Sequence, residues 1–299
     1  LSKNGYAKIF ELGINSPEVL FAVEFKSSVI DHAYDAYVRP SGDTKELGKQ
    51  VYSGFVPTSE LVDSYEMAGD GGNFSWEKHG KDPYANREPR FYATILYNGA
   101  DWMGRKIESF VGGKDGYKAY ENAGAAGTTV TGYYLRKYLI DGDKTWVTSG
   151  SGQDWIVLRY AEVLLNKAEA LAMENWNKNS AEALQALNDV RARVGLPARA
   201  TADKETFLEY VRHERKVELA GEGFRYWDLR RWRLAEKVID GQNVHGVKIS
   251  KQSDGSFTYE QVDADGGHKR IFYDRYYRFA IPLSERSNNS LCTNNDGWI

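Results

Sequence analysis

The sequence predicts a mainly helical protein in which a loop-rich first part is joined to a helical second part. After about residue 155, apolar residues recur at the three- and four-residue spacing of helices with one buried face. Residues 1–154 are instead rich in Gly, Tyr and turn residues, and residues 243–270 are polar and Gly-rich, as in a β-hairpin or a surface insertion. We therefore expect two regions, 1–154 and 155–299, within one continuous structural domain.

The first region contains only short candidate elements. Residues 18–25 are rich in β-branched and aromatic side chains and predict a strand. Residues 59–66 predict a short helix entered through Pro57, and residues 89–97 fit either a helix or a strand. Long loops cover residues 69–86 and 112–132, and loops of this length are usually functional or disordered.

The second region opens with two amphipathic helices. The first begins at about Trp155, and the second begins near Asn179, a suitable N-cap with Glu182 three residues later. Their apolar stripes are Leu158, Ala161, Leu164, Leu165, Ala168, Leu171 and Ala172, and then Ala183, Leu184, Leu187, Val190 and Val194. The connection between them is short, so we expect an antiparallel hairpin of the tetratricopeptide type.

Two further helices and an extended tail complete the predicted order. A third helix follows Thr201, and glycines 221 and 223 separate it from a fourth over residues 224–239. Residues 243–270 come next and are predicted to form a β-hairpin or a surface insertion. Residues 276–283 are predicted to be an extended segment that completes the fold.

Composition excludes several classes of function. The chain has 299 residues, a net charge of -3 and a pI near 6, which gives it no electrostatic attraction to nucleic acid. Its one cysteine, Cys292, excludes an internal disulfide framework and a thiolate metal cluster. No run approaches the roughly 20 apolar residues of a membrane span.

No cofactor site is expected from the motifs. The five histidines share no metal-ligand spacing, and residues 149–152 are a Ser-Gly turn rather than a nucleophile elbow. Residues 141–143 and 263–265 each carry two aspartates suited to calcium but lack the twelve-residue loop pattern. Calcium therefore remains an open alternative to no ion at all.

A run of charges in the third and fourth helices permits two interpretations. Glu214 and Glu218 lie one helical turn apart, and paired carboxylates can perform acid–base catalysis. Arginines and one further acid lie close by in sequence, at Arg215, Arg225, Asp228, Arg230 and Arg231. We interpret the set as a partly buried ion-pair cluster that holds the helices together across the Gly221–Gly223 break, not as a catalytic site.

Aromatic residues in the long loops are the predicted ligand site. The candidates are Phe74 and Trp76 in the loop of residues 71–80, together with Tyr84 and Trp102. A sugar ring presents an apolar face that stacks on an aromatic plane while neighbouring polar groups bind its hydroxyls. The alternative is that these rings attach their loops to the helical region.

Several motifs resemble one known family along nearly the whole chain. They are EVLF (18–21), PTSELVDSYE (57–66), REPRF (87–91), LRYAEVLLNKAEA (158–170), NDVRARVGL (188–196), ERKVEL (214–219), GFRYWDLRRW (223–232), IPLSE (281–285) and NNDGW (294–298). The chain is thereby identified as resembling the SusD/RagB family of Bacteroidetes outer-membrane nutrient-binding lipoproteins. Glu88, Thr293 and Asp296 depart from the family pattern.

This resemblance implies a SusD-like fold and a non-catalytic, surface-exposed receptor. Such a receptor binds oligosaccharide and passes it to a TonB-dependent, SusC-like transporter. It is held at the outer membrane by an N-terminal lipid anchor, which we expect in a part of the protein preceding Leu1, together with the first helical repeats. Two alternatives stay open: a peptide- or protein-binding receptor, as in the RagB branch, and a glycoside hydrolase, which needs two carboxylates flanking a cleft.

Overall fold

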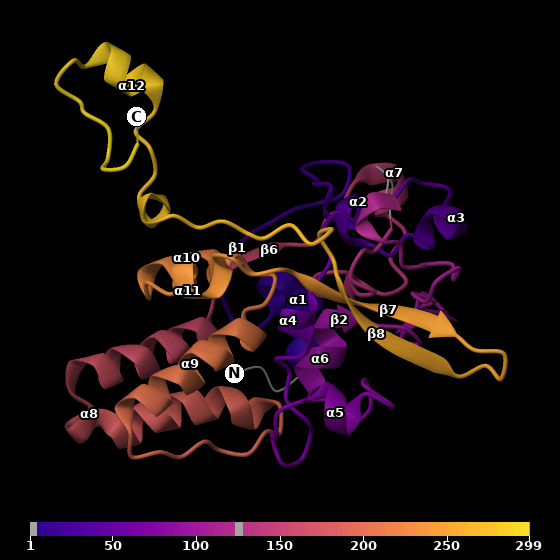
Figure 1. Cartoon of the computed structure of the whole chain (residues 1–299), viewed down its shortest axis with the longest axis horizontal. Helices are drawn as coiled ribbons and strands as arrows, with labels where there is room; N and C mark the ends of the chain where they lie inside the picture. The colour runs from indigo at the N-terminus through magenta and orange to yellow at the C-terminus, as the bar shows by residue number, and fades with distance from the viewer. Residues whose placement is uncertain (1–4, 123–127, 299) are drawn as a thin grey trace.

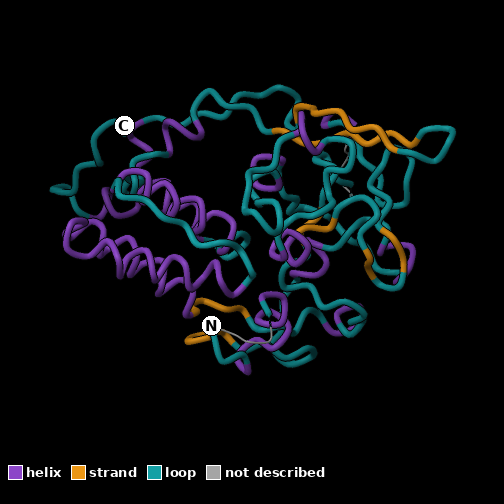
Figure 2. The backbone as a smooth tube through the Cα atoms, turned by 90° about the horizontal axis from the view of Figure 1, so that it is seen from below, coloured by secondary structure: helices purple, strands orange, loops and turns teal. Residues whose placement is uncertain are grey.

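The helical and loop-rich regions lie at opposite sides of the molecule. The computed structural model describes residues 5–122 and 128–298. Helices α8 (Tyr160–Arg193) and α9 (Lys204–Glu218) form one side, and the short elements of the first half form the other (Figure 1; Figure 2). The mainly helical fold predicted from the sequence is confirmed.

Helix α8 is a hairpin of two arms that run side by side (Figure 1). The backbone leaves helical geometry at Asn175, with φ -161° and ψ 95°, so the chain reverses there. The side chain of Asn175 accepts a hydrogen bond from the Lys178 backbone amide at 3.2 Å. The predicted hairpin is thus correct, but its second arm does not start at Asn179. The amide of Asn179 instead donates back to the Leu171 carbonyl at 3.2 Å.

The segment before α8 is a strand, not the start of a helix. β6 (Trp155–Arg159) pairs antiparallel with β1 (Val19–Val23), and Val23 lies opposite Trp155. Strand β1 was predicted over residues 18–25, and it supplies the partner that the sequence around Trp155 could not reveal. Residues 155–157 are aromatic or β-branched, and such residues pack well on a pleated surface.

Helix α9 packs on both arms of α8 and completes the helical core. Its side chains Phe207, Leu208 and Val211 lie in one cluster with residues of the two arms. From the first arm come Ala161, Leu164, Leu165, Ala168 and Ala172, and from the second Ala183, Ala186, Leu187 and Val190. These are largely the stripes predicted from helical spacing.

The predicted fourth helix is two helices. α10 (Phe224–Arg231) has Trp232 as its C-cap residue, and α11 (Ala235–Ile239) begins three residues after Trp232. Between them Arg233 adopts a φ of 56°, in the left-handed region that ends a helix. The Leu234 amide donates to the Leu229 carbonyl at 2.9 Å across this break.

The predicted hairpin is present, whereas the tail differs from expectation. β7 (His245–Lys251) pairs antiparallel with β8 (Phe257–Asp263), from His245 opposite Asp263 to Lys251 opposite Phe257. After the 3-10 helix η3 (Asp274–Tyr277), the chain runs out to α12 (Leu283–Asn288). Figure 1 shows this yellow arm projecting from the body instead of wrapping over it.

The remaining elements of the loop-rich region are short. They are α1 (Tyr6–Leu12), η1 (Gly13–Asn15), α2 (Tyr34–Val38), α3 (Asp43–Leu47), α4 (Ser59–Val62), α5 (Trp76–His79), α6 (Pro89–Thr94), β2 (Ile95–Leu96), β3 (Asp101–Trp102), β4 (Arg105–Lys106), η2 (Tyr120–Asn122), β5 (Tyr134–Leu135) and α7 (Trp146–Ser149). The helix expected over residues 59–66 is the shorter α4. Residues 89–97 form a helix and then a strand, α6 and β2.

A second core joins the two regions. Phe91 and Ile95 of the first region pack in one cluster with Val217, at the end of α9, and with Val247 and Ile249 of the hairpin. The long-range contacts that build the loop-rich side therefore come from both halves of the sequence.

Candidate functional site

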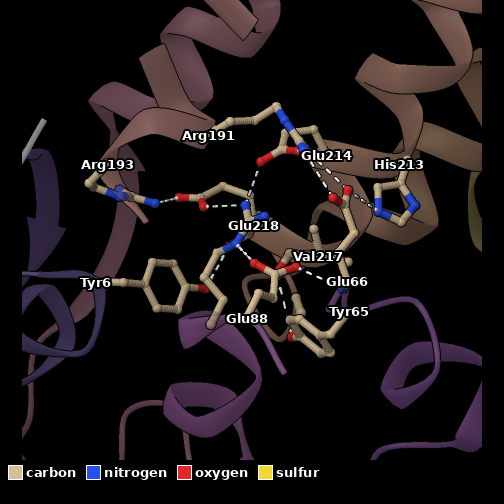
Figure 3. Close-up of polar contacts among 12 residues, drawn as sticks. Tyr6, Tyr65, Glu66, Glu88, Arg191, Arg193, His213, Glu214, Val217 and Glu218 are labelled. Carbon is tan, nitrogen blue, oxygen red and sulfur yellow. Dashed lines mark hydrogen bonds and ion pairs between the residues drawn. The ribbon is translucent and has the colours of Figure 1, made fainter. Parts of the chain in front are cut away.

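The paired glutamates of α9 lie inside a network of ion pairs and not in a cleft. Glu214 and Glu218 are both buried. Arg90, also buried, donates to Glu214 at 2.5 Å and to Glu218 at 3.0 Å, and its Nε donates to Glu88 at 2.6 Å. Figure 3 shows the carboxylates turned toward one another around the arginine side chains.

Three more arginines surround these glutamates. Arg191 bridges Glu214 at 3.0 Å and Glu66 at 2.9 Å (Figure 3). Arg159 donates to Glu218 at 2.6 Å, and Arg193 donates to the same carboxylate. The cluster interpretation is confirmed, and Arg215 of α9 does pair with Asp228 of α10 across the Gly221–Gly223 break. Among the described residues, however, the cations that pair with Glu214 and Glu218 are not the predicted Arg215, Arg225 and Arg230. Arg215, Asp228 and Arg231 pair as a separate local group, with Nε–O distances of 2.8 and 2.9 Å.

The surrounding charges keep Glu218 ionised. Burial alone would raise the pKa of this carboxyl group, but Arg193, Arg159 and Arg90 together hold the pKa well below its ordinary value. A general acid in glycoside hydrolysis needs a raised pKa and access to substrate. Glu218 has neither, so the observed geometry gives the α9 glutamates a structural role.

The rings predicted as exposed sugar platforms are mostly buried. The exposed fractions of Phe74, Tyr84 and Trp102 are 8%, 6% and 1%. Trp102 lies against the guanidinium of Arg39, 5.2 Å from the ring centre, and its Nε1 donates to Asp43 at 3.0 Å. The prediction of exposed rings is therefore wrong for these three residues.

Neighbouring side chains explain why these rings turn inward. Phe74 packs beneath the Arg87 guanidinium at 4.1 Å, and Tyr84 stacks on Phe91 and contacts Tyr97 in a tilted arrangement. Trp76 is half-buried, and its Nε1 donates to Asp63 at 2.9 Å. The alternative interpretation, in which the rings attach their loops to the body, describes this arrangement.

A different group of aromatic side chains lines the surface. Tyr37 and Phe55 face a hollow of about 390 Å³, and their exposed fractions are 46% and 63%. Tyr52 stacks on Tyr37 with ring centres 5.1 Å apart and an interplanar angle of 26°. Trp155 and Tyr34 complete the wall, with ring centres 5.9 Å apart.

This hollow continues in two directions, and we call the whole surface the aromatic trough. On one side it shares Tyr34, Phe55 and Trp155 with an apolar hollow of about 600 Å³ that reaches Leu61 and Gly221. On the other it shares His32 and Ala33 with a polar hollow of about 670 Å³, lined also by Ser28, Asp31, Lys49, Thr148, Ser149 and Gly150. The trough thus joins flat apolar faces to hydrogen-bonding groups.

Local contacts hold the polar end of the trough in shape. Lys49 donates through Nζ to the carbonyls of Trp146 and Val147 at 3.0 and 2.7 Å. Gly150 has a φ of 74°, and a Cβ atom at this position would lie 2.4 Å from Cγ of Asp31. Glycine is therefore required where this loop passes the Asp31 side chain.

Sequence reasoning missed these residues although the signal was present. Tyr34 and Tyr37 are three residues apart on α2, and Phe55 lies in a loop without a periodic apolar pattern. The same argument instead selected Phe74 and Trp102. It failed for these two residues because the sequence does not show which aromatic side chains are covered by another segment of the chain.

Of the aspartates considered for calcium, Asp141 and Asp143 accept hydrogen bonds from backbone amides. Asp141 accepts a hydrogen bond from the Met103 amide at 2.8 Å, and Asp143 accepts from the Thr145 amide at 2.8 Å. In the described ranges, no three or more His, Cys, Asp or Glu side chains gather as metal ligands. In the same ranges, no helix combines the length and hydropathy needed to cross a bilayer.

Comparison with known proteins assigns the chain to a family. The model of the SusD family matches residues 17–298. The chain belongs to the SusD family. The two regions of this SusD family member therefore fall within one family pattern, as the motif resemblance implied.

Individual relatives match at lower identity. SusD-like protein P38 of Formosa agariphila is 32% identical over 133 residues, which is 41% of this chain and 25% of P38. A crystal structure of a SusD-like protein from Bacteroides fragilis is 25% identical, with a TM-score of 0.78, over 99% of this chain and 57% of that one. A SusD-like carbohydrate binding protein from the same species is 26% identical, with a TM-score of 0.75, over 96% and 56%. The chain thus spans little more than half of these solved chains.

Proposed function

We propose that this SusD family member binds an oligosaccharide in the aromatic trough and does not transform it. The single observation that carries the proposal is a group of aromatic rings, the exposed Tyr37 and Phe55 and the partly buried Trp155, next to the polar wall at Asp31 and Lys49. Stacking on two rings with a few hydrogen bonds corresponds to a Kd of roughly mM to µM, or about -4 to -8 kcal/mol.

The relatives support the ligand class. One of the similar structures is described as a SusD-like carbohydrate binding protein, and it aligns with 96% of this chain. Weak and reversible binding suits a receptor that must release its oligosaccharide. We further propose delivery of the oligosaccharide to a TonB-dependent, SusC-like transporter by a lipid-anchored protein at the outer-membrane surface, as the family resemblance implies.

The buried ion-pair network supports the non-catalytic part of the proposal. Glu214 and Glu218 are the carboxylate pair that the sequence offered for hydrolysis. Both are buried and form ion pairs with four arginines, so they have no access to a bound sugar. Prolonged incubation of the protein with each bound glycan should release no reducing ends. Release of reducing ends by the purified protein would overturn this part.

The binding site is tested by a glycan array followed by isothermal titration with the best ligand. Phe55→Ala and Tyr37→Ala should each weaken binding at least tenfold, because each removes an exposed stacking face. Tyr273→Ala removes a ring of similar exposure, 50%, that lies directly before η3 and outside the trough, and it should leave the affinity unchanged. Unchanged affinity in both trough variants would reject the site, and binding of peptides in place of glycans would favour the RagB-like alternative.

A further inference from the structure

A second pocket lies between α8 and α10, away from the aromatic trough. It has a volume of about 450 Å³ and shares no lining residue with the three hollows of the trough. Helix α8 contributes Glu162, Asn166 and Glu169 to its wall, and α10 contributes Trp227 and Asp228. The pocket is therefore an independent feature, and a ligand in it does not depend on the proposed function of the trough.

Two of the three acids in the pocket are matched by arginines. Arg215 donates through Nε to Asp228 at 2.8 Å. Arg231 binds Glu169 with two hydrogen bonds of 2.6 and 2.7 Å and also reaches Asp228 at 2.9 Å. Glu162 is the third acid, so the lining carries three carboxylates against two guanidiniums.

Glu162 is buried and, in the described part of the chain, forms no ion pair; Arg215 of the same pocket donates instead to Asn166 at 2.7 Å. Its exposed fraction is 8%, and Oε1 accepts one hydrogen bond, from the neutral amide of Asn166 at 3.1 Å. Within residues 5–122 and 128–298, Oε2 has no hydrogen-bond donor. A buried carboxylate that lacks donors is costly, and a cation brought by a ligand would offset that cost.

The mouth of the pocket adds flat apolar surface. The exposed fractions of Trp227 and Met173, both in the lining, are 56% and 58%. An indole face attracts both a cation and the C–H face of a sugar ring. A ligand that carries an ammonium group on a flat ring matches both halves of this pocket.

We propose that this pocket binds a sugar with a free, protonated amino group. The ammonium group pairs with Glu162 while the sugar ring packs on Trp227. An N-acetylated sugar has the same ring but neither the charge nor the ammonium donors, so it should bind much more weakly.

The experiment compares two tetrasaccharides by isothermal titration at low ionic strength. One is the β-1,4-linked glucosamine tetramer, and the other is its fully N-acetylated form. The wild-type protein should bind the amine form at least tenfold more tightly. Glu162→Gln should abolish this preference, while Glu205→Gln, which neutralises an exposed acid on α9, should retain it.

Two further variants separate this pocket from the trough and replace Glu162→Gln if that variant does not fold. Phe55→Ala weakens the trough and should preserve the preference for the amine form, so failure of the trough and failure of this pocket are distinguishable. If Glu162→Gln does not fold, Trp227→Ala, whose ring is exposed, should reduce amine-form binding at least fivefold. Equal affinity for both tetramers, no binding of the amine form, or an unchanged preference in Glu162→Gln would overturn the proposal.

Discussion

Two groups of aromatic side chains in the loop-rich region of this SusD family member differ in exposure. Trp102 and Phe74 are buried beneath the guanidiniums of Arg39 and Arg87, whereas Tyr37 and Phe55 are 46% and 63% exposed. Both groups lie in the loop-rich region, on short elements or in the loops between them, and contain similar residue types. The difference shows that an aromatic side chain in this region becomes structural when other side chains enclose it: a guanidinium covers each of the two buried rings, and a carboxylate also binds the Trp102 indole.

The enclosing partners are specific. Arg39 also pairs with Asp35 at 2.7 Å and with Asp43 at 3.4 Å, and Asp43 accepts the hydrogen bond of the Trp102 indole. Tyr37 has a stacked neighbour, Tyr52, which is itself 45% exposed. The first arrangement stabilises the fold, and the second leaves ring faces available to a ligand.

The largest expected loss of stability follows from a change in the buried ion-pair network, because this network stabilises the fold that carries both groups of aromatic side chains. Arg90→Ala leaves Glu88, Glu214 and Glu218 buried with one cation fewer, which should cost about 3–5 kcal/mol. Urea unfolding measures the loss. Arg233→Ala breaks an exposed pair and should cost less than about 1 kcal/mol, so equal costs would contradict the structural role of the network.

Truncation of a buried ring should be nearly as damaging. Trp102→Ala removes a fully buried side chain and its hydrogen bond to Asp43, at a cost of about 3–5 kcal/mol. The glycan affinity of the folded fraction should stay unchanged, because the ring lies outside the trough. A stable Trp102→Ala variant with lost binding would instead support the ligand role predicted for this residue from the sequence.

Truncation of an exposed ring should reduce glycan affinity and leave stability nearly unchanged. Phe55→Ala should change the free energy of unfolding by less than about 0.5 kcal/mol, since its side chain is mostly exposed. Its glycan affinity should fall about tenfold, or about 1.4 kcal/mol. Thermal unfolding and titration on the same sample separate the two quantities, and a large loss of stability would count against a ligand-facing ring.

The smallest effect concerns Asp63, which holds the half-buried Trp76. Burial raises the pKa of this carboxyl group to about 6. The folded protein then binds more protons than the unfolded chain between about pH 4 and pH 6, so this group's stabilising contribution is lost as the pH rises through 6. Asp63→Asn keeps an acceptor for the Trp76 indole and should raise stability at pH 8 by on the order of 1 kcal/mol.

Unfolding curves across this pH range check the prediction. The dependence of stability on pH between 4 and 6 should be shallower in Asp63→Asn than in the wild type. Glu77→Gln, at an exposed acid in α5, serves as the control and should leave the slope unchanged. Lower stability of Asp63→Asn at pH 8 would show that the charged carboxylate stabilises the fold.

The sequence by itself determined the features that depend on local order. The helical spacing of Leu164, Ala168 and Ala172 predicted an amphipathic helix, and the polar run after residue 243 predicted the β7–β8 hairpin. The ordered motifs indicated the family. These signals are local because helical periodicity and turn chemistry are set by residues a few positions apart.

Only the tertiary structure decided which side chains meet across long separations. Glu218 pairs with Arg90, 128 residues away, and not with the cations beside it in sequence. Likewise Trp155 starts a strand because β1 supplies its hydrogen bonds, and Trp102 is buried because Asp43, 59 residues earlier, reaches its indole. Burial and ion pairing depend on the packing of distant segments, so the trough became visible only in the folded chain.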